Sequence, residues 1–143
     1  RLPDGGEIVG VDGEVLGRHT GTHRYTVGQR RGLGVAVAEP MYVVQIRPRE
    51  RRVVAGTAAD LLSDELVARD CNWIAIAEPD GPVRCRARIR YRAAEAPATI
   101  GPAGDGLFHV RFDEPQRAIT PGQAVVFYDG DDVLGGGWIT PTP

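Results

Sequence analysis

An alternating run of arginines, residues 84–92, is the most distinctive chemical feature of the sequence. It reads Arg84-Cys85-Arg86-Ala87-Arg88-Ile89-Arg90-Tyr91-Arg92, with Arg at every even position. Because successive strand side chains point to opposite faces, an extended run would project five guanidinium groups from one face at intervals of about 6.6 Å. The odd-numbered side chains, Tyr91 included, would point into a core. A helix would spread the same arginines around its circumference, so the pattern predicts a strand.

This arginine run predicts contact with a polyanion. Guanidinium groups match phosphate oxygens with forked N–H donors and also stack on bases. The candidate RNA contacts are Arg88, Arg90 and Arg92, and the Tyr91 ring would join them if the end of the strand twists open. The alternative is an ordinary outer barrel face, with Asp113 or Glu114 as counter-charges.

A glycine-rich segment, residues 19–34, is a second candidate for anion binding. Glycines at 21, 28, 32 and 34 predict tight turns that present free backbone amides. Gln29, Arg30 and Arg31 add donors suited to phosphates and base edges. We therefore predict that this segment can bind phosphate groups or RNA.

A third candidate is Gln123, which follows a Pro121-Gly122 turn and opens an apolar strand. A glutamine in this position usually satisfies the turn with its amide. Recognition of a ligand is the alternative, and the local sequence alone leaves both open.

Catalytic and metal chemistry is not predicted within these residues. The 17 basic residues are all Arg, and without Lys there is no phosphate loop of the Walker type and no Schiff base. His19 and His23 have no further nearby ligand, so we expect no metal site. Cys85 is expected to point into the core, and Cys71 has no cationic neighbour that would lower its pKa.

The global composition fits a folded module from a reducing compartment. The chain has 143 residues, 42% hydrophobic and 25% charged, and a net charge of −2. Residues 18–52 and 84–117 are basic blocks in an otherwise acidic chain, a distribution that favours a polyanion-facing side. Two cysteines are too few for a disulfide scaffold, which indicates a cytoplasmic protein, and no apolar run is long enough to span a membrane. The N-terminus resembles the cut end of a longer chain.

The elements that must position these residues are short β-strands. Asp12-Gly13 between apolar runs predicts a hairpin with a two-residue turn, and residues 42–46 and 52–55 predict a second strand pair. Further strands are expected at the ranges 65–76, 84–92, 98–100, 107–112, 123–128 and 133–139. Many short strands with almost no helical periodicity predict an all-β protein of two small β-domains, residues 1–62 and 63–143, the second a six-stranded barrel.

The sequence resembles the tRNA-specific 2-thiouridylases over essentially its whole length. The resemblance rests on motifs that occur in the family's order. They are Gly21-x-x-x-Tyr25-Thr26-x-Gly28-Gln29-Arg30-Arg31-Gly32-Leu33-Gly34, Tyr42-Val43-Val44, Asn72-Trp73-Ile74, Ile89-Arg90-Tyr91-Arg92, Phe112-Asp113-Glu114-Pro115, Ala118-Ile119-Thr120-Pro121-Gly122-Gln123 and Leu134-Gly135-Gly136-Gly137. Arg31 stands where the family usually has Lys, which keeps the charge.

The resemblance implies that the chain is the central and C-terminal portion of such an enzyme. The family uses ATP and a cysteine persulfide to convert wobble uridine 34 of tRNA to 2-thiouridine, with the ATP site and both catalytic cysteines in an N-terminal domain. Its positions resembling Arg90, Tyr91 and Gln123 contact tRNA. The implied partners are the tRNA anticodon arm, the catalytic domain and a sulfur-donor protein, and the 143 residues alone are expected to be inactive and to hold no cofactor.

Two alternatives remain open at this point. One is a protein-interaction module whose arginines meet an acidic partner or the catalytic domain. The other is a non-catalytic RNA-binding barrel that resembles those of translation factors.

Overall fold

A computed structural model describes residues 5–30, 33 and 40–141. The chain divides into two compact units, Arg1–Leu62 and Ser63–Pro143, which are described separately below. Arg31 and most of the Gly32–Gly34 motif lie outside the described residues. No helix in the described ranges is both long enough and apolar enough to cross a membrane.

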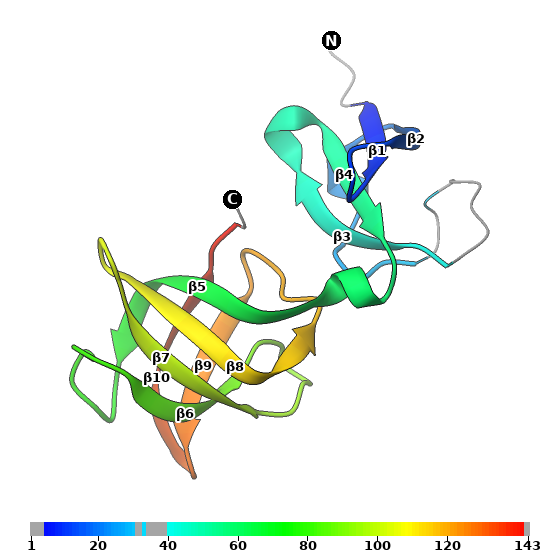
Figure 1. Ribbon diagram of the computed structural model, residues 1–143. Helices are drawn as coiled ribbons and strands as arrows, with labels where there is room; N and C mark the ends of the chain where they lie inside the picture. Colours follow the sequence, from blue (N-terminus) through cyan, green and yellow to red (C-terminus); the bar gives the residue numbers. More distant parts are fainter. Residues whose placement is uncertain (1–4, 31–32, 34–39, 142–143) are drawn as a thin grey trace. The chain divides into compact units, whose positions relative to one another are not determined.

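The first unit is a four-stranded sheet with the order β2-β1-β4-β3 (Figure 1). Its strands are β1 (Gly6–Gly10), β2 (Val15–His19), β3 (Tyr42–Arg47) and β4 (Arg52–Gly56). The sheet is antiparallel except for the central pair, β1 and β4, which run parallel. Three 3-10 turns join or follow the strands, at Thr22–Arg24, Pro48–Glu50 and Ala59–Leu61. A small core of buried residues holds the unit together, namely Ile8, Leu33, Val43, Val53 and Ala55.

The β1–β2 hairpin forms where Asp12-Gly13 predicted it, but its loop is longer than the expected two residues. Gly10 N–H donates to the Glu14 carbonyl (2.7 Å), and Gly13 N–H donates to the Gly10 carbonyl (3.0 Å). Gly13 has a φ of +90°, so a left-handed residue follows the tight turn and adds one position to the loop. The Asp12 carboxylate then accepts a hydrogen bond from Glu14 N–H (3.1 Å).

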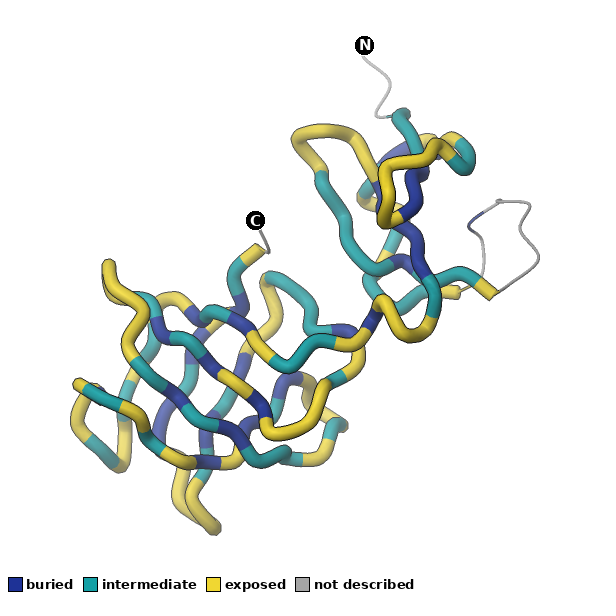
Figure 2. The backbone as a smooth tube through the Cα atoms, in the orientation of Figure 1, coloured by how far each residue is buried: buried dark blue, intermediate teal, exposed yellow. Residues whose placement is uncertain are grey.

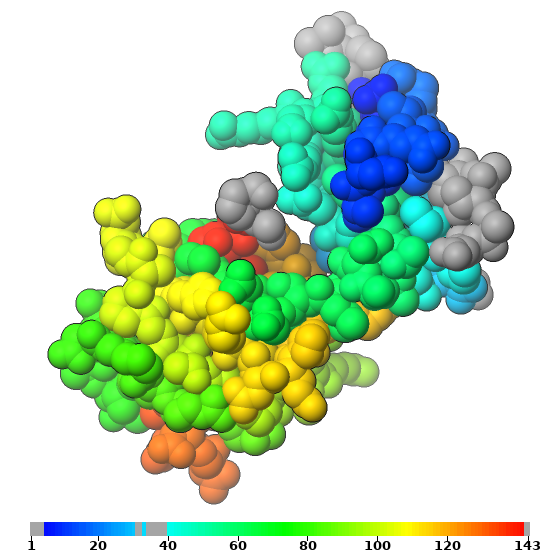
Figure 3. All heavy atoms as spheres, viewed as in Figure 1, coloured from blue at the N-terminus to red at the C-terminus, as the bar shows by residue number. Residues whose placement is uncertain are grey.

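The second unit is a closed barrel of six strands in the order β10-β5-β8-β7-β6-β9. The strands are β5 (Leu62–Trp73), β6 (Val83–Arg88), β7 (Ala96–Gly104), β8 (Leu107–Arg117), β9 (Ala124–Asp129) and β10 (Asp132–Ile139). In Figure 3 the green side chains of β5 lie against the yellow side chains of β8, as the strand order requires. The all-β class and the six-stranded barrel are therefore confirmed.

Alternating burial along the strands fills the barrel (Figure 2). Trp73 is partly buried and packs against this core, edge-on to Phe108 (4.9 Å between ring centroids) and stacked on Phe127 (5.7 Å). Such aromatic pairs contribute about 0.5–1.5 kcal/mol beyond the area that they bury. On β6 the apolar residues Cys85 and Ala87 are buried, as the alternating sequence predicted.

Strand β10 approaches its neighbours so closely that it has no room for side chains at Gly135–Gly137. A Cβ atom at Gly135 would overlap the Asn72 carbonyl oxygen and lie 2.8 Å from Cε3 of Trp73. At Gly101, on β7, a Cβ atom would meet nothing within 4 Å. Barrel closure therefore requires glycine at position 135 but not at position 101.

We expect Gly135→Ala to lower the free energy of unfolding by about 1–3 kcal/mol, because backbone or the core indole must shift. Gly101→Ala is the matched control and should change it by less than about 0.5 kcal/mol. Urea denaturation of the full chain, followed by tryptophan fluorescence, measures both. Equal stability of the two variants would contradict the packing argument.

Candidate nucleic-acid interface

The first half of the arginine run forms a ladder on the outer wall of the barrel. Arg84, Arg86 and Arg88 lie on β6 with their side chains outward, and we call these three residues the arginine face. The predicted strand over 84–92 is too long, because β6 ends at Arg88. The last two arginines of the run belong to the connection that follows.

The arginine face is neutralised by carboxylates of the barrel itself. Arg84 donates two hydrogen bonds to the Asp113 carboxylate, at 2.7 and 2.8 Å, and a third to Thr99. The hydrogen bonds from Arg84, with its charge, hold the pKa of Asp113 below its usual value. The sequence offered Asp113 or Glu114 as a counter-charge, and Asp113 is the one that pairs with Arg84.

A single carboxylate, Glu95, serves the next two arginines. It lies 3.9 Å from Arg86 Nε and 3.5 Å from Arg88 Nη2, and its backbone carbonyl accepts a further hydrogen bond from Arg86. The Arg88 guanidinium also lies over the Tyr128 ring, 5.3 Å from the centroid, in a cation–π contact. Of the five arginines expected on one face of a strand, three lie on β6, and the alternative of internal counter-charges describes these three. Acids of the barrel relieve the repulsion between neighbouring like charges.

Arg90 is bonded differently, to backbone and not to a carboxylate. Its Nη1 donates to the carbonyls of Arg117 (2.7 Å) and Ala118 (3.1 Å), where β8 ends. Ala118 has a φ of +58°, a conformation that costs an L-residue about 1–2 kcal/mol, and Thr120 Oγ1 donates to the same carbonyl. Arg90 therefore links the connection after β6 to the connection between β8 and β9. Two of its five N–H groups are used in this way.

Tyr91 lies fully in solvent at this end of the barrel. Its exposed fraction is 88%, the largest of the exposed apolar and aromatic residues, so the expectation that it fills the core is wrong. The reason is a turn at Arg90, whose carbonyl accepts a hydrogen bond from Ala93 N–H (3.1 Å) and ends the strand alternation. Arg92 is exposed in the same turn, and no contact of its side chain occurs within the described parts of the chain.

Gln123 is brought to the same end by the antiparallel pairing of β6 with β9. Arg88 pairs with Val126, so Tyr91 and Gln123 each lie three residues beyond this pair, on adjacent segments. The backbone of Gln123 is held by Thr120 and Ile139 (3.2 and 2.9 Å). Its exposed side-chain amide makes no hydrogen bond to any described residue, so the amide does not satisfy the turn. We call the segments 89–95 and 118–123 together the Arg90 end of the barrel.

The glycine-rich candidates belong to the other unit and have a partly structural role. The Gln29 side-chain oxygen accepts a hydrogen bond from Thr26 N–H (3.0 Å), and Gln29 and Gly28 pair with the backbone of Val43. Arg30 is exposed, and Arg31 lies outside the described residues. The structure therefore brings Arg90, Tyr91, Arg92 and Gln123 together on one unit and leaves Gln29 in a turn on the other.

His19 is a structural residue of the first unit. It is buried, its Nε2 lies 2.8 Å from the Arg51 carbonyl, and its ring packs edge-on against Tyr25. Within the described ranges, no three His, Cys, Asp or Glu side chains gather as metal ligands would.

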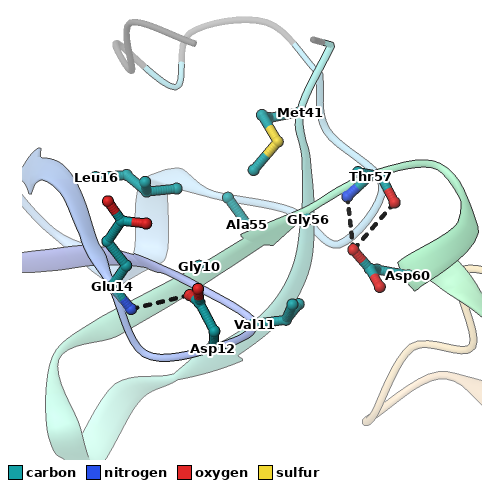
Figure 4. Close-up of a pocket in the computed structure, with 10 residues that line it drawn as sticks. All are labelled: Gly10, Val11, Asp12, Glu14, Leu16, Met41, Ala55, Gly56, Thr57 and Asp60. Carbon is teal, nitrogen blue, oxygen red and sulfur yellow. Dashed lines mark hydrogen bonds between the residues drawn. The ribbon is translucent and has the colours of Figure 1, made fainter. Parts of the chain in front are cut away.

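A shallow hollow in the first unit was not predicted from the sequence (Figure 4). Its lining residues come from the β1–β2 hairpin, the residue before β3, the end of β4 and the segment that follows β4, and they are Gly10, Val11, Asp12, Glu14, Leu16, Met41, Ala55, Gly56, Thr57 and Asp60. The Asp60 carboxylate is engaged there by Thr57 N–H (2.9 Å) and Oγ1 (3.0 Å). The Thr-x-x-Asp spacing is the sequence signal of this local turn, and it indicates no catalytic group.

Both cysteine thiols are held in the protonated form. Burial, with the charges of Asp70 and Glu78, raises the pKa of Cys71 to about 11, and burial raises that of Cys85 to about 11. The thiolate is the reactive form, so neither residue has the environment of a nucleophile.

Two family models together cover almost the whole chain. Residues 63–139 match the aminomethyltransferase beta-barrel domain, and residues 2–57 match the tRNA methyl transferase PRC-barrel domain. Relatives similar to the chain over both parts are named tRNA-specific 2-thiouridylase MnmA. The chain belongs to the tRNA-specific 2-thiouridylase family.

The 2-thiouridylases most similar to it include those of Acidobacterium capsulatum, at 52% identity, Koribacter versatilis, at 54%, and Synechocystis sp., at 50%. The alignments cover 96%, 96% and 97% of this chain but only 38%, 38% and 39% of those proteins. The chain thus spans about two fifths of the length of these 2-thiouridylases and corresponds to their C-terminal domains. The resemblance found in the sequence is confirmed.

We expect both cysteines to be nearly inert to alkylation at pH 7. A pKa raised from 9.0 to about 11 lowers the thiolate fraction about 100-fold relative to a free cysteine. The labelling rate with iodoacetamide should rise about tenfold for each pH unit from 7 to 10, as measured by mass spectrometry of the folded chain. Urea-unfolded chain is the control, and labelling of the folded chain at the unfolded rate would contradict the prediction.

Proposed function

We propose that the chain is the tRNA-binding portion of a tRNA 2-thiouridylase, and that the Arg90 end of the barrel grips the anticodon arm. The complete cytoplasmic enzyme would use ATP and a persulfide sulfur, delivered by a sulfur-donor protein, to convert wobble uridine 34 to 2-thiouridine. ATP binding and sulfur transfer would belong to the catalytic domain outside these 143 residues. The chain's family membership and its match to the C-terminal part of relatives named for this activity support the proposal.

The observation that carries the tRNA-binding proposal is the exposure of Tyr91 beside Arg90 and Gln123. An 88% exposed tyrosine contributes little to the stability of the barrel. A phenol ring in this position can stack on a nucleobase, and the neighbouring free amide of Gln123 can donate to and accept from base edges or sugar hydroxyls. Stacking and hydrogen bonding would then act on adjacent parts of the RNA.

Arg90 would supply the electrostatic part of the grip. Its two hydrogen bonds to carbonyls use Nη1 only, and no carboxylate of the described chain pairs with it. The N–H groups on Nε and Nη2 remain for a phosphate, while the bonds to Arg117 and Ala118 hold the guanidinium in place. A pre-oriented cation loses less side-chain entropy when it binds. Arg92, Arg88 and, on the other unit, Gln29, Arg30 and Arg31 are proposed as weaker contacts.

A firm hold on the nucleotides around the target is what the chemistry requires. An enzyme that modifies a base must take it out of the stack, and a fixed grip on its neighbours determines where the extruded base lies. The internal neutralisation of Arg84, Arg86 and Arg88 disfavours the alternative in which this face awaits an acidic protein.

We expect Tyr91→Ala in the complete enzyme to weaken tRNA binding by about 1–3 kcal/mol, roughly 5- to 150-fold in Kd, because a base loses its stacking partner. Tyr91→Phe keeps the ring and should bind within about threefold of the wild type. Filter binding with a tRNA that carries unmodified uridine 34 measures both. Wild-type affinity in Tyr91→Ala, with the melting temperature unchanged, would remove this end of the barrel from the site.

We expect Arg90→Ala to reduce both the affinity and its dependence on salt. Each lost phosphate contact lowers the slope of log K against log salt by about 0.7–0.9. Arg84→Ala is the matched control, since Arg84 lies on the same strand but is paired with Asp113. Binding measured from 50 to 300 mM KCl should give a shallower slope for Arg90→Ala only. Identical slopes for the two variants would contradict a phosphate contact at Arg90.

A further inference from the structure

The connection between β8 and β9, residues 118–123, supports two of the polar groups proposed to bind RNA. Arg90 donates hydrogen bonds to carbonyls at its beginning, and Gln123 is its last residue. The connection contains no strand and no helix, so turns and hydrogen bonds from side chains must fix its backbone. A residue that fixes this backbone therefore determines where Arg90 and Gln123 lie.

The carbonyls that hold Arg90 converge because of an unusual backbone conformation at Ala118. In extended backbone, successive carbonyls point to opposite sides, and a single guanidinium nitrogen cannot reach two of them. The φ of +58° at Ala118 turns its carbonyl toward the same side as that of Arg117, and Arg90 Nη1 donates to both. An L-residue does not prefer this conformation, so the arrangement needs support from its surroundings.

Thr120 supplies part of this support through its side chain. Its Oγ1 donates to the Ala118 carbonyl (2.9 Å), the same oxygen that accepts from Arg90 (3.1 Å). A carbonyl oxygen has two lone pairs, so both hydrogen bonds can form together. The branched Cβ of Thr120 restricts its rotamers, and the following Pro121 restricts its backbone, which limits the positions that the hydroxyl can take.

The backbone of Thr120 fixes the other end of the connection. Its carbonyl accepts the Gln123 N–H (3.2 Å), which closes a four-residue turn around Pro121-Gly122. Gly122 has a φ of +86°, as the third residue of a type II turn requires. Thr120 thus bonds through its side chain to the carbonyl that holds Arg90 and through its backbone to Gln123.

We propose that Thr120 is a positioning residue of the Arg90 end, which sets the spacing between a phosphate contact at Arg90 and a base or sugar contact at Gln123. Its hydroxyl acts on Arg90 through the Ala118 carbonyl. Because these hydrogen bonds form within the chain, the two contacts are arranged before RNA binds, and less conformational entropy is lost on binding. This inference rests on the proposed function.

The test is tRNA binding by the complete enzyme with Thr120→Val, which keeps the shape of the side chain and loses the hydroxyl. Kd should rise about 3- to 10-fold, the contribution of one hydrogen bond. Thr120→Ser keeps a hydroxyl and should recover most of the affinity. Thr99→Val is the matched control, because the Thr99 hydroxyl accepts a hydrogen bond from Arg84, which is paired with Asp113, and this variant should bind tRNA as tightly as the wild type.

A double-mutant cycle with Arg90→Ala separates positioning from a general effect on stability. If Thr120 acts through Arg90, Thr120→Val weakens binding in the wild-type background and causes no further loss in Arg90→Ala. An equal loss in both backgrounds would assign Thr120 a structural role and overturn the inference. A lower melting temperature of Thr120→Val with unchanged Kd would overturn it as well.

Hydrogen exchange of the wild-type enzyme gives a second measurement, which needs no substitution. The amides of Gly122 and Gln123 are hydrogen-bonded to the carbonyls of Ile139 and Thr120. Their exchange before tRNA is added should therefore be at least about 100-fold slower than in the unfolded chain. Exchange at the unfolded rate would show that RNA arranges the connection, which contradicts pre-arrangement by Thr120.

The outcomes separate this inference from the proposed function. If Arg90→Ala weakens tRNA binding and Thr120→Val does not, the inference is overturned and the proposed function stands. If neither Arg90→Ala nor Tyr91→Ala weakens binding, the proposed function fails as well.

Discussion

Closure of the barrel around an apolar interior is the constraint from which the features of the second unit follow. A closed sheet has no free edge, so every strand must present one face to the interior and the other to solvent. Phe108 and Phe127 lie in the core with the partly buried Trp73 packed against them, and Gly135 lets β10 approach β5 closely enough to close the ring. The outward positions are free of this requirement, and the arginines occupy them.

The second consequence is electrostatic. Closure brings acids from elsewhere in the chain to the arginine face: Asp113 of β8 reaches Arg84 across β7, and Glu95, the last residue before β7, is shared by Arg86 and Arg88. Where β6 ends, the chain turns and no strand lies alongside to supply a carboxylate. Arg90 is bound there by backbone carbonyls, which orient the guanidinium but leave it charged. The pairing of arginines with carboxylates thus ends at the point where the strand stops.

The first unit shows that a residue selected as a binding candidate can have a local structural role. Gln29 was selected for its donors, but its side-chain oxygen accepts the Thr26 amide and its backbone pairs with β3. In a segment rich in glycine, these hydrogen bonds fix a backbone that bulky side chains would otherwise restrict. The glutamine motif shared with the 2-thiouridylases is explained in part by this turn.

Much of this architecture could be read from the sequence, because local patterns determine it. Alternation along the arginine run identified Cys85, Ala87 and Ile89 as buried, Asp12-Gly13 located the first hairpin, and the spacing of short apolar runs indicated an all-β protein with a six-stranded barrel. These features depend on the two-residue period of a strand and on backbone angles that glycine adopts readily.

Tertiary structure alone decided which of the candidate groups are available. Whether an arginine is neutralised depends on Asp113 and Glu95, which come from other strands or connections and whose positions follow from strand register. The exposure of Tyr91 depends on where β6 loses its pairing with β9, and the orientation of Arg90 depends on carbonyls at the distant end of β8. Sequence determined the faces of the strands, since each face is set by adjacent residues, whereas the neighbours of each side chain were set by pairing between distant segments.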